Sequence, residues 1–323
     1  MTLHLVCASH SPLAGFPAAE TDQVLAADAA MAARAAAIRE FDPELVIQFG
    51  PDHYAARHLD CMPCFCIGRS ATALDDVGGT PGRLNVPADL AADLLGFVRE
   101  DGIDAAWSHE MEVDHGFSQG LQRLCAGVAT YPVIPVFIDC IAPPFVPFRR
   151  SRFLGEAVGR WAAQRDERIL VIGTGGLTHN PDIFFPPVDV APEAVRPYLI
   201  HGTRQEELSR DEWLKNSDEA HRAIAPFLAD DSITDESLHI HEDWDREFLQ
   251  LLACGELEAV DAWRPDDIMR RLGIGTLEVH MWIAACAAAR AAGCPPPVID
   301  HYAPTKELGI GFGVLHPSSK ECR

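Results

Sequence analysis

The sequence predicts an α/β protein with a central, mostly parallel or mixed sheet that is flanked by helices. The first observation is a set of short, largely apolar runs, which lie at positions 3–8, 45–49, 133–138 and 169–172. Such runs are typical of strands that are buried on both faces of a sheet. The second observation is that longer stretches of helical composition separate these runs, which is the order expected of an α/β sheet.

Three helices are expected between the strands of the N-terminal half. Residues 18–41 are rich in alanine and end at Asp42 and Pro43, where proline disfavours helical backbone in the preceding residue. Residues 87–101 begin with a proline, which is favoured in the first turn of a helix. Residues 152–165 form the third expected helix, immediately before the strand at 169–172.

The C-terminal half has a different composition. Residues 186–267 are polar and contain three candidate helices, at 206–213, 218–228 and 245–252. An alanine-rich stretch at 275–292 predicts one long helix, followed by a strand-like segment at 298–302 and a glycine-spaced segment at 308–313. No linker or internal repeat interrupts the chain. We therefore expect a single domain over residues 1–323, with 186–267 as a mainly helical elaboration.

The charge of the chain excludes two classes of partner. The 323 residues include 48 Asp and Glu against 26 Lys and Arg, giving a formal net charge of −22. Nucleic acids and anionic membranes both attract clustered basic residues, so we expect neither as a partner. The first residues lack a basic, apolar signal segment. The most apolar stretches are interrupted by Asp139 and Arg290, so no membrane span is expected.

The ten cysteines, without a secretion signal, indicate a reducing cytoplasm rather than a disulfide framework. Cys61, Cys64 and Cys66 form a local cluster whose first pair has the spacing of a zinc knuckle. No second such pair follows. We therefore interpret the cluster as packed or incidental thiols, with a structural zinc site as the alternative.

The positions of four histidines are more informative than the total of fourteen. His10, His53 and His179 each follow a predicted strand, and His115 lies on a glycine-containing turn before a probable helix. In open α/β sheets, ligands bind outside the carboxyl ends of the strands. A single histidine is usually an ordinary loop or core residue. Three at strand ends are expected to converge on a site if those strands are neighbours.

A metal at this site requires a carboxylate, because non-haem Fe(II) oxygenases commonly use two histidines and one carboxylate. Glu278 is the candidate, since small or apolar residues follow it on the same side of the predicted helix. A salt bridge to a buried arginine is the alternative for Glu278. His239 and His241, in an acid-rich segment, form a rival cluster that we interpret as a solvated face.

Five segments resemble the class III extradiol ring-cleaving dioxygenases. They are Ser-His-Ser-Pro-Leu at 9–13, Pro-Asp-His-Tyr at 51–54, Val-Asp-His-Gly-Phe at 113–117, Gly-Gly-Leu-Thr-His at 175–179 and the stretch 276–282. Weaker similarity lies at 43–46, at 132–137 and at Trp244 and Asp245, whereas residues 186–240 match only loosely. The segments occur in the family's order over nearly the whole chain. Five motifs in this order are a far more specific indication of the family than any one motif alone.

The resemblance implies an enzyme that cleaves a catechol ring with O₂ and an Fe(II) cofactor. Carried over motif by motif, His10, His53 and Glu278 are the expected metal ligands. His115 is the expected proton donor, and His179 is the expected proton acceptor.

Three further residues are expected to support these groups from behind. They are Asp52, one candidate for holding a ligand's second ring nitrogen, with Asp114 and Tyr54. The resemblance also implies that the substrate is 3-(2,3-dihydroxyphenyl)propionate or 2,3-dihydroxycinnamate. An anionic side chain requires Arg, Lys or backbone N–H donors in an otherwise acidic protein, and the sequence does not identify them.

Three alternative functions remain open at this point. The chain could cleave another catechol, with an alkyl substituent or of the protocatechuate type. It could be a zinc hydrolase that uses the same three ligands, or a binding protein that kept the fold without the chemistry. The family resemblance also implies a homo-oligomer, in which we expect the apolar segment 308–315 to form part of a subunit contact.

Overall fold

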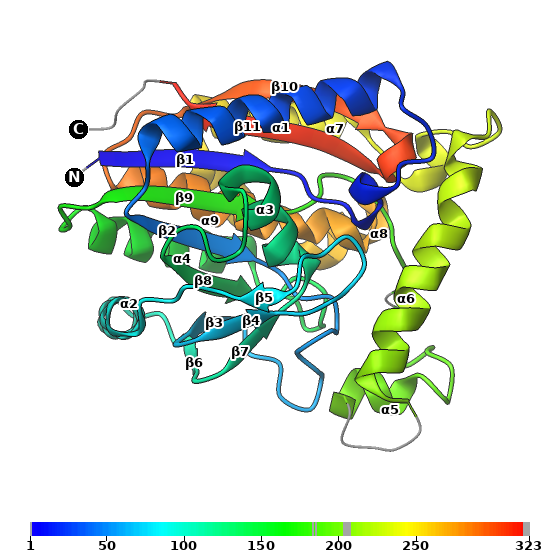
Figure 1. The fold of residues 1–323 in the computed structure, drawn as a ribbon, viewed down its shortest axis with the longest axis horizontal. Helices are drawn as coiled ribbons and strands as arrows, with labels where there is room; N and C mark the ends of the chain where they lie inside the picture. The colour runs from blue at the N-terminus through cyan, green and yellow to red at the C-terminus, as the bar shows by residue number, and fades with distance from the viewer. Residues whose placement is uncertain (1, 183, 185, 203–207, 319–323) are drawn as a thin grey trace.

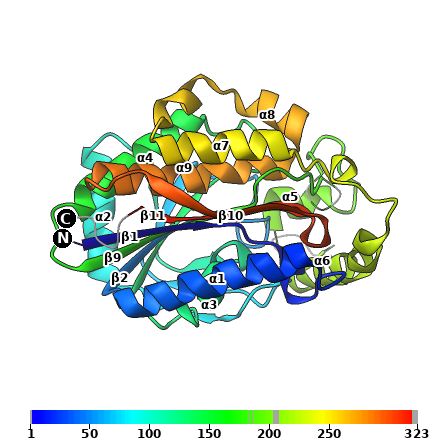
Figure 2. The same ribbon diagram turned by 90° about the horizontal axis from the view of Figure 1, so that it is seen from above.

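A computed structural model describes residues 2–182, 184, 186–202 and 208–318. Within these residues, eight strands form one mixed sheet with helices on both faces (Figures 1 and 2). The strand order is β10-β11-β1-β9-β2-β8-β3-β6. The predicted fold class is therefore confirmed.

The centre of the sheet is a block of four parallel strands, which are β1 (Thr2–Ala8), β9 (Arg168–Thr174), β2 (Leu45–Gly50) and β8 (Val133–Ile138). Nearly all of their residues are buried, as their apolar composition predicts. Successive side chains alternate between two cores, so that Leu5 and Cys7 face one helical layer and Val6 and Ala8 face the other.

Antiparallel strands extend this block on both sides. β11 (Ile310–Pro317) pairs with β1 and with β10 (Pro297–Thr305). On the other side β3 (Phe65–Gly68) is antiparallel to β8 and parallel to β6 (Ala106–Ser108). A second, three-stranded sheet has the order β5-β4-β7, formed by Gly82–Arg83, Ala71–Ala73 and Met111–Val113.

Helices cover the two faces unequally (Figure 2). α1 (Asp22–Phe41) and α3 (His115–Cys125) lie on one face. The other face carries α4 (Phe148–Ala162) and α9 (Val279–Ala291), with α2 (Ala88–Glu100), α7 (Glu242–Cys254) and α8 (Pro265–Leu272) around them.

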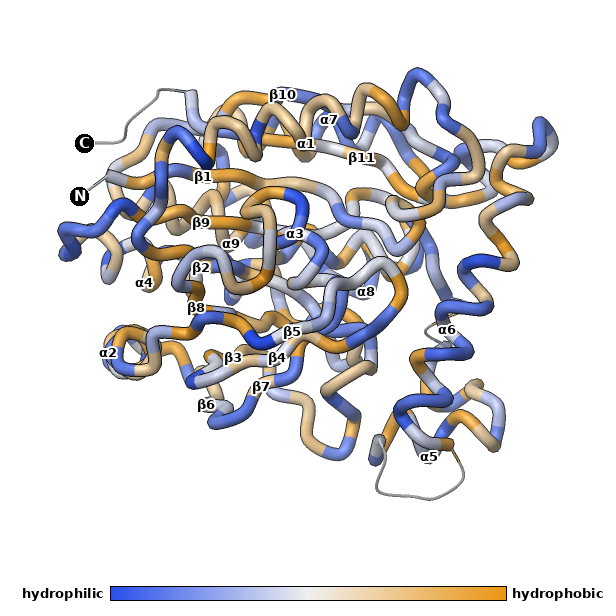
Figure 3. Tube along the Cα trace, in the orientation of Figure 1, coloured by the Kyte–Doolittle hydropathy of each residue, from blue (hydrophilic) through white to orange (hydrophobic). Residues whose placement is uncertain are grey.

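Of the predicted helical elaboration, α7 packs on a face of the sheet, and the part before it stands at one end (Figure 1). This part contains α5 (Arg196–His201), α6 (Arg210–Ile224) and the 3₁₀ turns Ala225–Ala229 and Glu236–Leu238. The central strands follow hydrophobic stretches of the chain, whereas α6 carries long hydrophilic ones (Figure 3). Of the helix predicted at 206–213, residues 206 and 207 lie outside the described residues, and α6 begins at Arg210. The helix predicted at 218–228 is divided between α6 and the first 3₁₀ turn.

Two expectations about the C-terminal part are wrong. The single helix predicted over 275–292 is a 3₁₀ turn, Ile274–Glu278, followed by α9, so Glu278 lies at a helix junction rather than on a helix face. The segment 308–315 is not a subunit contact surface, because it leads into β11, whose apolar residues are buried between β10 and β1. A strand inside the sheet has no apolar face left for a partner.

The cysteine cluster fits the interpretation as separate thiols. Cys66 is buried in β3, whereas Cys61 and Cys64 are exposed in the loop before it. The groups arranged to hold a metal among the described residues contain none of the three. Within the same residues, no helix has both the length and the apolar run needed to cross a bilayer.

Candidate active site

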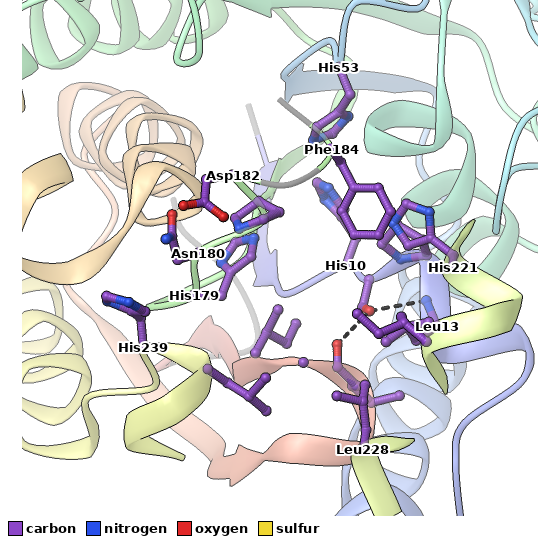
Figure 4. A pocket seen from close by; sticks show the side chains of 18 of the residues that line it. His10, Leu13, His53, His179, Asn180, Asp182, Phe184, His221, Leu228 and His239 are labelled. Carbon is purple, nitrogen blue, oxygen red and sulfur yellow. Dashed lines mark hydrogen bonds between the residues drawn. The ribbon is translucent and has the colours of Figure 1, made fainter. Parts of the chain in front are cut away.

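Three of the four predicted histidines follow adjacent strands of the sheet. β1 and β2 are both parallel neighbours of β9, so the carboxyl ends of the three strands lie together. His10, His53 and His179 come after these ends and line one cavity of about 360 Å³ (Figure 4). The predicted convergence is confirmed. His115 and Glu278 line the same cavity.

Glu278 lies between the histidines. Its Oε2 is 3.4 Å from Nε2 of His10 and accepts a hydrogen bond from the Gly176 N–H at 2.6 Å. Its Oε1 is 3.3 Å from Nε2 of His53 and 3.7 Å from Nε2 of His179. Burial raises the pKa of this carboxyl, but the surrounding imidazoles, His10 first, outweigh burial and hold the pKa well below its usual range. Glu278 is therefore ionised, and the alternative of a salt bridge to a buried arginine is wrong.

His53 is held from behind by Asp114. The Asp114 Oδ2 accepts hydrogen bonds from the His53 backbone N–H at 2.7 Å and from the ring Nδ1 at 2.8 Å. This leaves Nε2 to face Glu278. The prediction that Asp52 holds this ring nitrogen is wrong, because the Asp52 carboxylate accepts the backbone N–H groups of Ala56 and Arg57 instead. Asp52 thus shapes the loop that carries His53.

The predicted place of Tyr54 behind the ligands is also wrong. Its hydroxyl donates to the Ile141 carbonyl at 3.4 Å, and its ring lies in the apolar core. The Tyr54 backbone has φ 56°, and its carbonyl accepts a hydrogen bond from Tyr198. The residue therefore turns the chain after His53 rather than contacting the site.

His115 and His179 are supported by different partners. His115 is the first residue of α3, and its Nδ1 is 2.6 Å from Oδ2 of Asp76. The Nδ1 of His179 is 2.8 Å from the carbonyl oxygen of Leu177. A carbonyl oxygen can only accept, so this nitrogen of His179 carries the proton and Nε2 has the free lone pair. The Asp76 carboxylate likewise accepts, so Nδ1 of His115 also carries a proton.

The glycines around His179 explain part of the sequence motif. A Cβ at Gly176 would lie 2.4 Å from the His179 ring, and one at Gly275 would lie 2.2 Å from it. Neither position has room for a side chain. The two glycines therefore allow the backbone to enclose the imidazole.

The donors around Glu278 fit one divalent metal ion. Neighbouring ligands on an ion with bonds of about 2.1 Å lie about 3 Å apart when they are at right angles. The two contacts of the Glu278 oxygens with His10 and His53, at 3.4 and 3.3 Å, are close to this spacing. Two imidazoles and one carboxylate form a donor set that suits Fe(II). These residues could therefore hold the metal.

Comparison with known proteins identifies the family. Residues 4–312 match the family model described as the catalytic LigB subunit of aromatic ring-opening dioxygenase. The chain belongs to this family. The family resemblance predicted from the sequence is therefore confirmed, and with it the class of enzyme. The match covers the four histidines and Glu278.

Several curated relatives are similar over nearly their whole length. Proteins from Azotobacter vinelandii, Cupriavidus pinatubonensis and Paraburkholderia xenovorans are 39%, 41% and 41% identical, each over 98% of this chain. The matched part is also 98% of the length of each of the three relatives. All three are named 2,3-dihydroxyphenylpropionate/2,3-dihydroxicinnamic acid 1,2-dioxygenase.

The cavity of this dioxygenase has an apolar wall and a polar outer end. Apolar side chains from four separate regions of the chain form the wall, and they are Leu13, Phe184, Ile224, Leu228, Leu238, Leu308 and Ile310. Asn180, Asp182, Ser237 and His239 line the polar end (Figure 4). Among the described residues that line the cavity, none is a lysine or an arginine.

The interpretation of the 239–241 segment as a solvated face is wrong for this dioxygenase. His239 lines the cavity and adopts a left-handed backbone conformation, with φ 57°. His241 is half-buried, and its backbone N–H donates to Oγ1 of Thr178, next to His179. The acid-rich composition of this segment conceals its position over the cavity.

Two carboxylates of the site were missed by reasoning from the sequence. Asp76 lies 39 residues before the histidine that it holds, in a loop without a recognisable pattern. Asp245, in α7, accepts hydrogen bonds from the N–H and hydroxyl of Thr178 and from the Tyr302 hydroxyl. Burial raises the pKa of Asp245 to about 6. The weak family similarity at Trp244 and Asp245 was the available signal for the second.

Proposed function

We propose that this dioxygenase uses Fe(II) to cleave the ring of 3-(2,3-dihydroxyphenyl)propionate and of 2,3-dihydroxycinnamate beside the catechol hydroxyls. The observation that carries the proposal is one cavity lined by the cluster of Glu278 with His10 and His53 and by two further histidines. One of these, His115, is hydrogen-bonded to a carboxylate, and the other, His179, to a backbone carbonyl. The proposed product is a yellow 2-hydroxy-6-oxo-nona-2,4-dienedioate-type acid. The names of the relatives support this choice of substrates.

His10, His53 and Glu278 are the proposed ligands of the iron. When bound, the iron supplies a centre at which a catecholate and O₂ can react, a reaction that is spin-forbidden without it. The carboxylate balances part of the metal charge, and Asp114 keeps His53 in the tautomer whose Nε2 can bind a metal.

His179 is the proposed base. Its Nδ1–H donates to the Leu177 carbonyl, so the lone pair of Nε2 is free. That nitrogen lies 3.7 Å from a Glu278 oxygen, at the edge of the metal cluster. A catechol hydroxyl bound there would give its proton to Nε2.

His115 is the proposed acid. The Asp76 carboxylate accepts a hydrogen bond from the ring Nδ1, which leaves Nε2 for the cavity that His115 lines. The His115 and His53 rings stack with centroids 4.4 Å apart, so the acid lies against a proposed metal ligand. Its Nε2–H can then donate a proton to an oxygen of the reacting ring as the O–O bond breaks.

The polar end of the cavity is the proposed site of the substrate carboxylate. The side chain of Asn180 is oriented, because its Oδ1 accepts a hydrogen bond from the Ile274 N–H at 3.2 Å, and its amide N–H groups are the proposed donors. His239 offers a second donor at the same end. Asp182 also lies there, but it is exposed to solvent, which screens its charge. Imidazole and amide donors thus take the place expected for arginine or lysine.

The test is an oxygen-consumption assay with three catechols. Protein purified without oxygen and loaded with Fe(II) receives 3-(2,3-dihydroxyphenyl)propionate, 3-propylcatechol or protocatechuate in aerated buffer. We expect O₂ uptake and a yellow product with the propionate, and a lower kcat/KM with the other two. Preference for another catechol would refute the substrate but keep the reaction. O₂ uptake with none of them, or activity only with Zn²⁺, would contradict the proposed chemistry.

A further inference from the structure

Asp76 lies in the loop between β4 and β5 and reaches the N-terminus of α3. Its Oδ2 accepts two hydrogen bonds from the same residue, one from the His115 backbone N–H at 2.9 Å and one from the ring Nδ1 at 2.6 Å. The side chain is 4% exposed. A ring that is held together with its own backbone has little freedom to turn.

The loop that carries Asp76 is itself anchored to α3. The Thr80 N–H donates to Oγ of Ser118 at 3.1 Å, and Nε2 of Gln119 donates to the Gly78 carbonyl at 3.1 Å. Both partners lie on the first turns of the helix that begins with His115. The carboxylate and the imidazole are therefore fixed to one rigid unit.

The second oxygen of Asp76 is buried without a partner. Its Oδ1 makes no hydrogen bond among the described residues, and a Cβ at Gly79 would lie only 2.1 Å from it. An unpaired, buried carboxylate oxygen is unfavourable, and a neutral acceptor could hold the two N–H groups at a smaller cost. The negative charge therefore has a use beyond fixing the helix end.

The neighbouring acid cannot serve His115 in this way. Asp114 directs Oδ2 to His53 and Oδ1 to the Gly116 N–H at 2.9 Å. Each of the two stacked histidines thus has a carboxylate of its own. Asp114 supports the proposed metal ligand, and Asp76 supports the proposed acid.

We propose that Asp76 is a positioning residue for acid catalysis by His115, an inference that rests on the proposed role of His115. Asp76 fixes the ring through Nδ1 and so leaves Nε2 for the cavity that His115 lines. When Nε2–H passes its proton to the substrate oxygen, Nδ1–H stays on the ring and keeps its hydrogen bond to Asp76.

The test compares Asp76→Asn with Asp75→Asn as the matched control. Asp75 is exposed and adjacent to Asp76 in sequence, and its substitution by Asn is the same chemical change. We expect Asp76→Asn to lower kcat by about 10–100-fold, with KM, iron content and Tm close to those of the wild type. Asp75→Asn should leave all four unchanged. A purely structural role would instead raise KM or reduce iron content and Tm, and would overturn the proposal.

A double-mutant cycle shows whether Asp76 acts through His115. The variant Asp76→Asn/His115→Gln should be no slower than His115→Gln alone, because the group that Asp76 positions is already gone. Independent, multiplying losses would overturn the proposal. Wild-type activity of Asp76→Asn beside a slow His115→Gln would refute only the role of Asp76. Wild-type activity of His115→Gln would refute the proposed acid itself.

A measurement on the unaltered side chain covers the case in which Asp76→Asn does not fold. Protein labelled with ¹⁵N-histidine and loaded with diamagnetic Zn²⁺ gives imidazole ¹⁵N signals, and His115→Gln assigns those of His115. We expect a protonated Nδ1 in a strong hydrogen bond. An Nδ1 without a proton in the wild-type protein would contradict the proposal.

Discussion

The four histidines of the site differ in the hydrogen-bond partner of their ring Nδ1. His53 and His115 each have a carboxylate, and His179 has a backbone carbonyl. The Nδ1 of His10 has no hydrogen-bond partner among the described residues, and burial lowers the pKa of this ring to about 3. These contacts separate roles that the motifs alone leave equivalent.

The proposed acid and base can be removed one at a time. We expect His179→Gln and His115→Gln each to lower kcat by about 10²–10⁴-fold, because each loses one proton transfer. Both variants should keep their iron, since neither residue is a proposed ligand. His109→Gln is the control, because this histidine is exposed and outside the cavity. Steady-state kinetics and metal analysis decide the matter, and a variant with wild-type kcat would lose its assigned role.

The polar end of the cavity gives a second prediction at this scale. His239→Ala should raise KM for 3-(2,3-dihydroxyphenyl)propionate by about 10-fold, the loss expected for one hydrogen bond to a charged group. The neutral 3-propylcatechol is the control, and its KM should stay unchanged. An equal increase for both substrates would show that His239 shapes the cavity without recognising the carboxylate.

At the scale of elements, α4 and α9 approach each other through small residues. A Cβ at Gly155 would lie 2.1 Å from the Ala284 carbonyl oxygen, and one at Gly159 would lie 2.1 Å from that of Ala288. The spacing of four residues places both glycines on one face of α4. Glycine lowers the stability of a helix interior, so its presence at both positions follows from the close contact.

Substitutions at these glycines should separate packing from helix propensity. We expect Gly155→Ala to lower the free energy of unfolding by about 1–3 kcal/mol, because the added methyl forces the helices apart. Gly96→Ala in α2 is the matched control, since nothing lies within 4 Å of the new Cβ. It should raise stability by about 0.5–1 kcal/mol. Urea denaturation measures both, and a neutral Gly155→Ala would contradict the packing argument.

The central elements could be predicted because their signals are local. The strands at 45–50 and 168–174 are continuous apolar runs, and α1 begins and ends at ordinary helix signals, Thr21 and Asp42. The strands β3, β4, β5, β6 and β7 were missed, because two to four residues are too few to establish a period. The junction at Glu278 was missed because an alanine-rich helix gives no sign that its first turn is 3₁₀.

The site residues that belong to recognisable sequence motifs could be predicted, but their hydrogen-bond partners could not. The strand-end histidines carried their own signal, since each follows a recognisable strand. The partners behind them depend on tertiary contacts, 61 residues apart for His53 and Asp114 and 39 for His115 and Asp76. Asp52 is adjacent to His53 in sequence, but adjacency does not determine which way a carboxylate points, and Asp52 accepts the N–H groups of Ala56 and Arg57 instead.

At the scale of the whole molecule, a buried histidine links stability to pH. Burial, helped by Arg34 and His316, lowers the pKa of His4 to about 4, and its ring packs beside Phe41 at 5.1 Å between centroids. Below pH 6.5 the unfolded chain binds a proton at His4, whereas the folded chain does so only near pH 4. The contribution of His4 to stability is therefore complete above pH 6.5 and is lost as the pH falls.

Replacing His4 should reduce this loss. Between pH 7 and pH 5 we expect the free energy of unfolding of His4→Gln to fall by about 2 kcal/mol less than that of the wild type, at about 1.4 kcal/mol per pH unit and proton. Urea denaturation at the two pH values, with His109→Gln as an exposed control, gives the difference. Equal losses in all three proteins would mean that His4 is protonated in the folded state. The expected homo-oligomer stays a prediction, for which β11 offers no surface.

The pairing of β11 with β1 imposes an order on the maturation of this enzyme. The loop that holds His10 is fastened through Ser9 to Gly311 and through Ser11 to Leu308, contacts that span 302 and 297 residues. On a ribosome the N-terminal strand emerges early, but its neighbour is synthesised only after some 300 further residues. Contacts of such separation form late. The loop that carries His10 therefore takes its final form only after β11 has been synthesised.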